Sequence, residues 1–178
     1  MWMLERAIAI AAEAHAGQFD KAGAPYILHP LRVMLAVAPA AMECAVLHDV
    51  VEDCPEWPMD RLAAEGFHPI MLSALDAVTK RGGEDYDTYL SRVEANAIAR
   101  EVKLADLRDN MDASRGAPRN EKREAKYRLA LAVLTGARPT ELASSTLPPL
   151  PAAPYPDEQQ QPYSDPGPGQ SDEQAPGR

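Results

Sequence analysis

Residues 45–55 read AVLHDVVEDCP and combine a histidine, acidic residues and apolar residues in one predicted helix. Side chains four positions apart lie on one face of a helix, so His48 lies one turn before Glu52. Asp49 likewise lies one turn before Asp53. The remaining positions are mostly apolar: Val46, Leu47, Val50 and Val51. Because such residues are usually buried, the stretch predicts a helix that carries polar groups into a hydrophobic core.

Helical periodicity continues on both sides of this stretch. Apolar residues recur at helical spacing over residues 4–14, and Pro30 suits the first turn of a second helix. Pro39 ends that helix, and a third helix is predicted over residues 40–53. Further helical patterns follow as far as residue 135, and no convincing alternating strand is found. The pattern predicts an all-α fold, an irregular helical bundle.

The chain divides into an apolar part and a polar C-terminal part. Of its 178 residues, 46% are hydrophobic, which is enough for a globular core. From residue 137 onward Pro, Gln, Ser, Asp and Glu dominate, so this stretch cannot bury enough surface to offset its ordering entropy. We predict a helical domain over residues 1–136 and a disordered tail over residues 137–178.

The charge and the cysteine content restrict the partners and the compartment. The formal net charge of −9 argues against a nucleic acid partner, because phosphate backbones require clustered Lys and Arg. Glu5, Arg6 and Glu13 interrupt the first apolar run, which argues against a signal peptide and a membrane span. Two isolated cysteines suit a reducing compartment. We expect a cytoplasmic protein without a nucleic acid or membrane partner, and the oligomeric state stays open.

The acidic residues of the central helix need a compensating positive charge, because burying a carboxylate costs several kcal/mol. Arg32 is the only Lys or Arg between Lys21 and Arg61. A divalent cation would compensate better. Two imidazoles and two carboxylates form a mixed nitrogen and oxygen site that suits Mn, Fe or Zn and is poor for Ca. The natural remaining ligands are His29, beside the start of the second helix, and Asp106, in KLADLRDNM.

Each polar group also has an interpretation without function. The cluster in residues 45–55 could be a solvated helix face, although its apolar neighbours argue against exposure. Asp106 and Asn110 could be surface groups, but the apolar residues before them favour burial. Lys21 fits a phosphate contact and an ordinary surface lysine equally well. His15 and His68 are interpreted as packing and helix-entry residues. One basic run is interpreted as a solvated helix face: Arg119, Lys122, Arg123, Lys126 and Arg128.

Five motifs occur in order along the chain: AHAGQ (14–18), KAGAPYILHP (21–30), LHDVVEDC (47–54), AVTK (77–80) and KLADLRDNM (103–111). They resemble those of the HD superfamily of metal-dependent phosphohydrolases. Within it they are most similar to the hydrolase domain of RelA/SpoT homologues and to small stand-alone (p)ppGpp hydrolases. Together they cover most of residues 1–135, and five ordered blocks are far more specific than a lone His-Asp pair. The resemblance implies an all-α bundle of the HD-domain type.

The resemblance also implies roles for individual residues. The implied ligands, for Mn²⁺ or another divalent transition metal, are His29, His48, Asp49 and Asp106. Glu52 and Asp53 correspond to the acidic pair that orients and deprotonates the attacking water. Lys21 corresponds to a pyrophosphate contact and Asn110 to a nucleotide contact. The implied substrate is a small phosphorylated nucleotide. The implied reaction is hydrolysis of the 3′-pyrophosphate of ppGpp or pppGpp, which gives GDP or GTP and pyrophosphate.

Three positions depart from the family pattern. Asp20 stands where the family usually has a basic residue near the nucleotide base, Leu107 where it has Arg, and Ala113 where it has Thr. These differences affect guanine recognition and leave the metal ligands in place. Two alternatives therefore stay open: hydrolysis of another nucleotide, such as NADPH at its 2′-phosphate or a nucleoside phosphate, and a nucleotide-binding module without catalysis. The synthetase domain of the long RelA/SpoT enzymes is not recognised, so no synthetic activity is expected.

Overall fold

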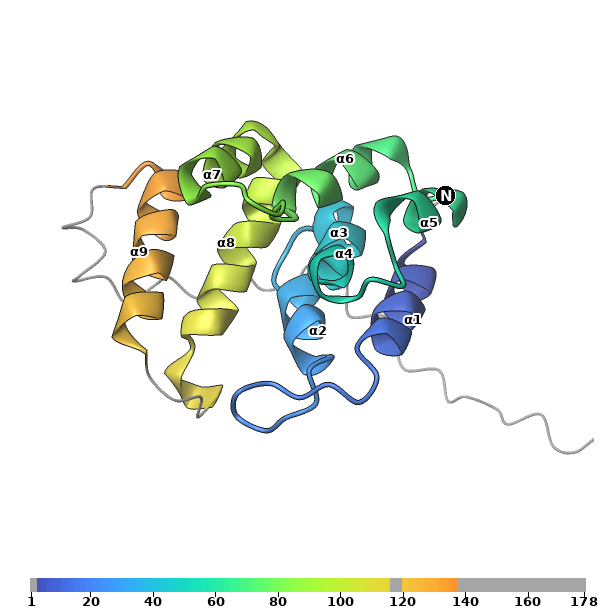
Figure 1. Cartoon of the computed structure of the whole chain (residues 1–178), viewed down its shortest axis with the longest axis horizontal. Helices are drawn as coiled ribbons and strands as arrows, with labels where there is room; N and C mark the ends of the chain where they lie inside the picture. The colour runs from blue at the N-terminus through green and yellow to red at the C-terminus, as the bar shows by residue number, and fades with distance from the viewer. Residues whose placement is uncertain (1–2, 116–119, 138–178) are drawn as a thin grey trace, which may run out of the picture.

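The computed structural model describes residues 3–115 and 120–137, so the predicted disordered tail lies outside the described residues apart from residue 137. Within these ranges the chain consists of helices and loops without a strand, and the predicted all-α class is confirmed (Figure 1). The α-helices are α1 (Leu4–Ala14), α2 (Leu28–Leu35), α3 (Met42–Leu47), α4 (Val50–Asp53), α5 (Met59–Ala64), α6 (Pro69–Val78), α7 (Tyr86–Ala95), α8 (Ala97–Met111) and α9 (Glu121–Thr135). Two short 3₁₀ helices are η1 (Pro39–Ala41) and η2 (Ala113–Arg115). None of the described helices is both long and apolar enough to cross a membrane.

Two hydrophobic clusters form the interior of the described residues. The first joins α1, α2, α3, α6 and α8, and its members include Ala7, Ile10, Val33, Leu47, Leu75 and Val102. The second joins α7, α8 and α9, and its members include Leu90, Val93, Leu107, Leu131 and Leu134. Figure 1 shows α8 between α9 on one side and α2 and α3 on the other. The helix α8 therefore connects the two clusters.

The helix predicted over residues 40–53 is interrupted, which corrects the sequence prediction. It begins as η1, continues as α3, and resumes as α4 after His48 and Asp49, which belong to neither helix. The carbonyl of Ala45 lies 2.8 Å from His48 Nδ1. In a continuous α-helix that carbonyl would accept from the amide of Asp49. The interruption therefore lies where the His48 side chain pairs with the carbonyl of Ala45 in α3.

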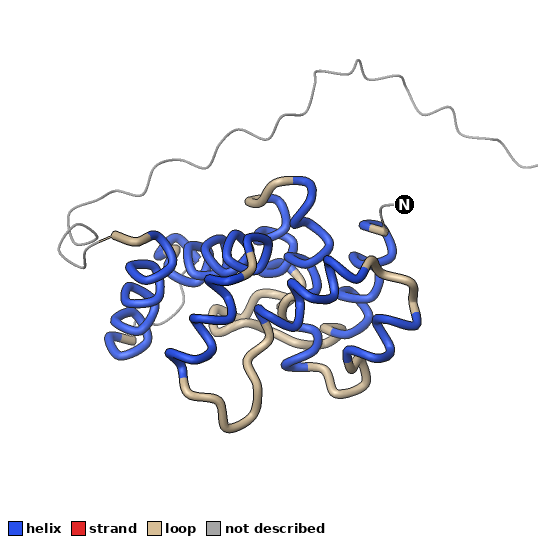
Figure 2. The backbone as a smooth tube through the Cα atoms, turned by 90° about the horizontal axis from the view of Figure 1, so that it is seen from above, coloured by secondary structure: helices blue, strands red, loops and turns tan. Residues whose placement is uncertain are grey.

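A long loop, residues 15–27, leads from α1 into α2 (Figures 1 and 2). The amide of Tyr26 donates to the carbonyl of Gln18 at 2.9 Å, which closes the loop. Asp20 Oδ1 accepts backbone amides two and four residues later, at 2.9 and 3.0 Å. Gly23, with a φ of 83°, adopts the left-handed conformation that such a turn requires. These contacts hold the loop in the turn that precedes His29.

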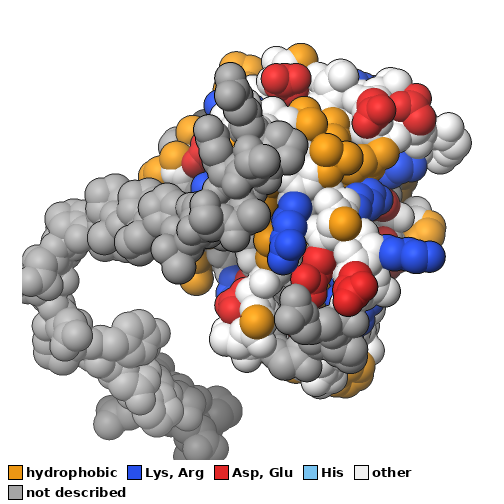
Figure 3. Space-filling view, turned by 90° about the vertical axis from the view of Figure 1, so that its left-hand side faces the viewer, with side chains coloured by type: hydrophobic (Ala, Val, Ile, Leu, Met, Phe, Trp, Pro, Cys, Tyr) orange, Lys and Arg blue, Asp and Glu red, His pale blue; other side chains and the backbone are white. Residues whose placement is uncertain are grey.

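The outer face of α9 is partly apolar. Leu129 and Val133 have 51% and 40% of their surface exposed, while Leu131 and Leu134 of the same helix are buried. Figure 3 views the molecule from the side of α9, where hydrophobic side chains reach the surface among charged ones. The helix thus packs on α7 and α8 with one face only.

Candidate metal centre

Three buried residues from different segments meet at one point. His29 lies on α2, His48 between α3 and α4, and Asp106 on α8. Each offers one possible ligand atom, and these atoms all lie within 4.8 Å of one another. The three residues could therefore hold a divalent metal ion, and they are residues that the sequence singles out.

Asp49 lies at the edge of this cluster. Its Oδ2 atom is 3.5 Å from His29 Nε2 and 3.2 Å from His48 Nε2. Asp106 Oδ1 is 3.3 Å from His29 Nε2 and 3.7 Å from His48 Nε2. Both imidazoles thus turn the same ring nitrogen toward the two carboxylates. His48 Nε2 is buried and has no hydrogen-bond partner among the described residues, so the donor set fits a cation that would satisfy it.

The other ring nitrogen of each histidine is held by a neighbour. His48 Nδ1 lies 2.8 Å from the carbonyl of Ala45. His29 Nδ1 lies 2.6 Å from Asp109 Oδ2. Both neighbours are hydrogen-bond acceptors, so they favour a proton on Nδ1 and leave Nε2 to face the cluster. The sequence analysis did not single out Asp109, although its position three after Asp106 places both on one helix face.

The two carboxylates are held in the same way. Lys103 Nζ donates to Asp106 Oδ2 at 2.7 Å, and the hydroxyl of Tyr26 donates to Asp49 Oδ2 at 2.6 Å. Asn110 Nδ2 also donates to Asp106, on its Oδ1 atom. Sequence reasoning missed Lys103, which supplies a buried positive charge from α8. The spacing of three residues from Asp106 was the signal that could have found it.

The carboxylates of the cluster remain charged despite their burial. Burial raises the pKa of Asp106, but Lys103 and the two histidines outweigh it and hold this pKa well below its usual range. Burial also acts to raise the pKa of Asp49, and the neighbouring histidines lower it overall. Burial lowers the pKa of His29, but hydrogen bonds to three carboxylates raise it to about 11. The neighbouring positive groups, Lys103 and the histidines, thus favour the ionised form of both carboxylates.

The predicted acidic pair lies beside the cluster and outside it. Glu52 and Asp53 are exposed at the end of α4. Glu52 Oε2 accepts from the backbone amide of Lys80 at 3.1 Å, in the connection between α6 and α7. Burial, Asp49 and Glu52 together raise the pKa of Asp53. A carboxylate with a raised pKa is a stronger proton acceptor than an ordinary one.

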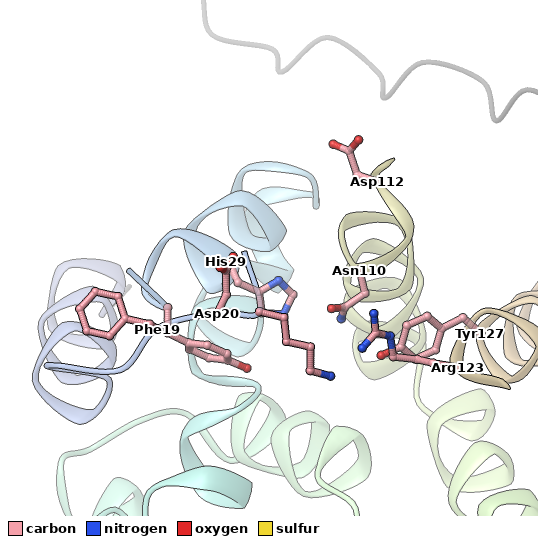
Figure 4. Close-up of a pocket in the computed structure, with 9 residues that line it drawn as sticks. Phe19, Asp20, His29, Asn110, Asp112, Arg123 and Tyr127 are labelled. Atoms are coloured by element: carbon pink, nitrogen blue, oxygen red, sulfur yellow. The ribbon is translucent and has the colours of Figure 1, made fainter. Parts of the chain in front are cut away.

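A cavity of about 270 Å³ opens next to His29 (Figure 4). Its lining consists of Phe19, Asp20, Lys21, Tyr26, His29, Asn110, Asp112, Arg123 and Tyr127. Figure 4 shows His29 on one side and Asn110, Arg123 and Tyr127 on the other. The predicted contacts Lys21 and Asn110 thus share one cavity. Arg123, which the sequence suggested to be part of a solvated face, lines it as well, because α9 packs beside α8.

The structure places all three positions that depart from the family pattern. Leu107 is 0% exposed and belongs to the second hydrophobic cluster, so its side chain contributes to the core. Asp20 lines the cavity, and it also accepts backbone amides of its own loop. Ala113 is exposed in η2. The substitution at Leu107 is therefore a matter of packing, whereas Asp20 changes the charge of the cavity.

Comparison with known proteins identifies bacterial relatives. No family model matches the chain. It is 35% identical over 144 residues to a GTP pyrophosphokinase of Streptomyces coelicolor, covering 73% of this chain and 17% of that protein. It is 32% identical over 132 residues to a guanosine-3′,5′-bis(diphosphate) 3′-pyrophosphohydrolase of Borreliella burgdorferi, covering 65% of this chain and 19% of that protein. It is 30% identical over 122 residues to the bifunctional (p)ppGpp synthase/hydrolase SpoT of Escherichia coli, covering 61% and 17%.

The chain thus spans less than a fifth of the length of these curated relatives, whose names describe both synthesis and hydrolysis. The matched share of this chain is 61% to 73%. The chain is a relative of the enzymes of the RelA/SpoT type, and the resemblance predicted from its motifs is confirmed.

Proposed function

We propose that the chain is a metal-dependent phosphohydrolase that removes the 3′-pyrophosphate of ppGpp or pppGpp and releases GDP or GTP. The observation that carries this proposal is the buried cluster of His29, His48 and Asp106 beside a cavity lined by Lys21 and Asn110. The relatives named as 3′-pyrophosphohydrolases support it. The two cysteines of the chain are free and buried, which agrees with the cytoplasmic location that this substrate implies.

In this proposal, His29, His48, Asp49 and Asp106 hold one divalent ion. Mixed imidazole and carboxylate donors suit Mn²⁺, the expected ion, and also other divalent transition metals. When bound, such an ion supplies Lewis acidity for phosphoryl oxygens and lowers the pKa of water toward neutrality.

The chain's own residues bind the substrate and accept the proton. Lys21 binds the pyrophosphate and Asn110 the nucleotide. Glu52 orients the attacking water, and Asp53, whose pKa is raised by burial and by neighbouring carboxylates, accepts its proton. Lys80 holds Glu52 through a backbone amide, which fixes the direction of that carboxylate.

The test is release of pyrophosphate from ppGpp by the purified full chain with Mn²⁺ and after metal removal. Asp49→Asn should lower the rate by about 100-fold or more, because a ligand that stabilises transition-state charge is lost. Asp76→Asn is the matched control. Asp76 lies on α6, where its exposed side chain pairs with Arg81. A wild-type chain that releases no pyrophosphate, or an Asp49→Asn chain as active as the control, contradicts the proposal.

A second candidate is hydrolysis of a less highly charged nucleotide. The carboxylates of Asp20 and Asp112 line the cavity together with Lys21 and Arg123, so its acidic and basic groups balance. Such a lining favours a polyanion less than a purely basic one. A panel of ppGpp, NADPH and nucleoside phosphates, scored for phosphate against pyrophosphate, separates the two activities. Metal-dependent binding of a nucleotide without turnover of any substrate would instead indicate a binding module.

A further inference from the structure

Asp109 connects the candidate metal centre to Arg32, which lies one turn after His29 on α2. Its Oδ2 atom lies 2.6 Å from His29 Nδ1, and its Oδ1 atom accepts from Arg32 Nε at 2.6 Å. Arg32 Nη2 donates to Oδ2 at 3.2 Å, so the guanidinium makes a bidentate contact with the carboxylate. The Asp109 side chain is 10% exposed. A carboxylate this well buried and doubly held has little freedom to turn.

The four residues around this contact form a reciprocal pattern. His29 and Arg32 are three positions apart on α2, and Asp106 and Asp109 are three positions apart on α8, so each pair shares a helix face. His29 lies between the two carboxylates, with Nε2 at 3.3 Å from Asp106 and Nδ1 at 2.6 Å from Asp109. The two helices are therefore joined at the point where they supply the proposed ligands.

The chemistry of a carboxylate determines what Asp109 does to His29. An ionised carboxylate only accepts hydrogen bonds, so the proton of a neutral imidazole is held on Nδ1 and the lone pair of Nε2 is directed at the cluster. A negative charge on the far nitrogen also makes the ligating nitrogen more basic. Arg32 holds the Asp109 carboxylate in this orientation through two of its nitrogens.

We infer that Asp109, held by Arg32, is a positioning residue that sets the orientation and basicity of His29 as a metal ligand. This inference rests on the proposed metal centre and goes beyond the ligands themselves. The rival explanation is that Asp109 and Arg32 only fasten α2 to α8. The two explanations differ in whether metal affinity changes or only the stability of the metal-free fold.

The test is calorimetric titration of the metal-stripped full chain with Mn²⁺ at one fixed pH. Asp109→Asn should weaken binding about 10- to 100-fold, the usual effect of losing such a partner. Arg32→Gln should weaken it in the same direction but less. The double variant should be no weaker than Asp109→Asn alone, because both changes act through one contact.

Asp76→Asn is the charge control. It also removes one negative charge, and the Asp76 side chain is exposed on α6, outside the cluster and the cavity. Its Mn²⁺ affinity should stay within about threefold of the wild type, the range expected for a screened surface charge. An equal loss in Asp76→Asn and Asp109→Asn would overturn the inference, because it would reduce the effect to general charge.

A second readout reports on His29 directly. In the chain loaded with diamagnetic Zn²⁺, the Nδ1 proton of His29 should give a protected, strongly downfield resonance in nuclear magnetic resonance spectra. That resonance should move upfield or vanish in Asp109→Asn. A structural role alone would change the unfolding temperature of the metal-free chain and leave the Mn²⁺ affinity in place.

The remaining outcomes separate this inference from the proposed function. A wild-type chain that binds no Mn²⁺ contradicts the metal centre and the inference together. An Asp109→Asn chain that binds Mn²⁺ as tightly as the wild-type chain contradicts the inference alone. Should Asp109→Asn not fold, Arg32→Gln decides the question, because an unchanged affinity in that variant would also overturn the inference.

Discussion

At the scale of single residues, Lys103 compensates the negative charge of the buried Asp106 in the metal-free chain. Its ammonium group lies 2.7 Å from Asp106 Oδ2 and close to the ring of Tyr89. Burial lowers the pKa of Lys103, but Asp106 and Tyr89 outweigh it and raise this pKa well above its usual value. The sequence offered only one basic side chain near the central helix, Arg32, so a divalent cation was favoured as the compensating charge. The basic side chain that compensates Asp106 is Lys103, which lies on α8 three residues before it.

Replacing Lys103 should therefore destabilise the fold, because the buried Asp106 carboxylate would lose its positive partner. Lys103→Met should lower the free energy of unfolding of the metal-free chain by about 3–5 kcal/mol, the usual result of removing one partner of a buried pair. Saturating Mn²⁺ should recover part of this loss, since a divalent ion supplies the missing charge. Urea unfolding with and without Mn²⁺ measures both values. Lys122→Met on the exposed part of α9 is the control, and a loss in Lys103→Met that Mn²⁺ does not reduce would contradict this explanation.

Leu107 provides a second prediction at this scale. Because its side chain is 0% exposed within the second cluster, Leu107→Arg, which restores the family's basic residue, should bury an unpaired charge. We expect a loss of about 4 kcal/mol or more in stability, measured by urea unfolding. Leu107→Met, which conserves volume, should cost less than about 1.5 kcal/mol. Improved ppGpp hydrolysis in a stable Leu107→Arg chain would show that this position faces the nucleotide.

At the scale of elements, the sequence predicted where helices stop at prolines and not where they break without one. Pro39 separates α2 from α3 as expected, because proline disfavours a helical residue before it. The break at His48 and Asp49 depends on a bond from a side chain to the carbonyl of Ala45. Such a bond competes with the helix only when the surrounding packing orients the side chain, and no periodicity in the sequence encodes it.

The connection between α6 and α7 depends on one arginine. Arg92 on α7 donates to the carbonyls of Asp76 and Thr79 at the end of α6, at 2.7 and 2.9 Å. It also holds Glu84 through Nε and Nη2, both at 2.7 Å. The last carbonyls of a helix lack partners within the helix, so Arg92 caps α6 and fastens the connecting loop.

This arrangement makes the stability of the connection dependent on pH. The hydrogen bond from Arg92 lowers the pKa of Glu84 from 4.5 to about 2. A lowered pKa contributes stability that is fully present above pH 4.5 and is lost as the pH falls toward 2. Glu84→Gln should therefore be less stable than the wild type at pH 7, and the difference should shrink as the pH falls below 4.5 and vanish below pH 2. Thermal unfolding over this range measures the difference, and a difference independent of pH would contradict the assignment.

At the scale of the whole molecule, the arrangement of α9 is what the sequence could least predict. The polar first half and apolar second half of residues 121–135 indicated a helix, and the helix is present. Its packing beside α7 and α8 brings Arg123 and Tyr127 to the cavity. Such packing depends on shape complementarity between distant segments, whereas the meeting of His29, His48 and Asp106 followed from the chemistry of buried charge and from the motifs.

The described residues form both clusters, and α9 ends at Thr135, followed by Gly136 in the left-handed conformation typical of helix ends. A chain shortened after residue 137 should therefore keep its unfolding temperature within about 2 °C and its Mn²⁺ affinity unchanged. Differential scanning calorimetry and titration measure these values. Shortening after residue 120 is the contrasting control, because it removes Leu131 and Leu134 from the second cluster. A large loss on removing residues 138–178 alone would show that they contribute to the fold.

The candidate ligands come from three separate segments, so an ion bound there would make the stability of the chain depend on metal supply. His29, His48 and Asp106 are brought within reach of one another only by the folded chain, so an ion bound there stabilises the native state and not the unfolded one. Each tenfold rise in free ion above the dissociation constant then adds about 1.4 kcal/mol to stability. Proteases that digest unfolded chains would remove this protein fastest in cells starved of the metal, so its abundance would follow metal supply.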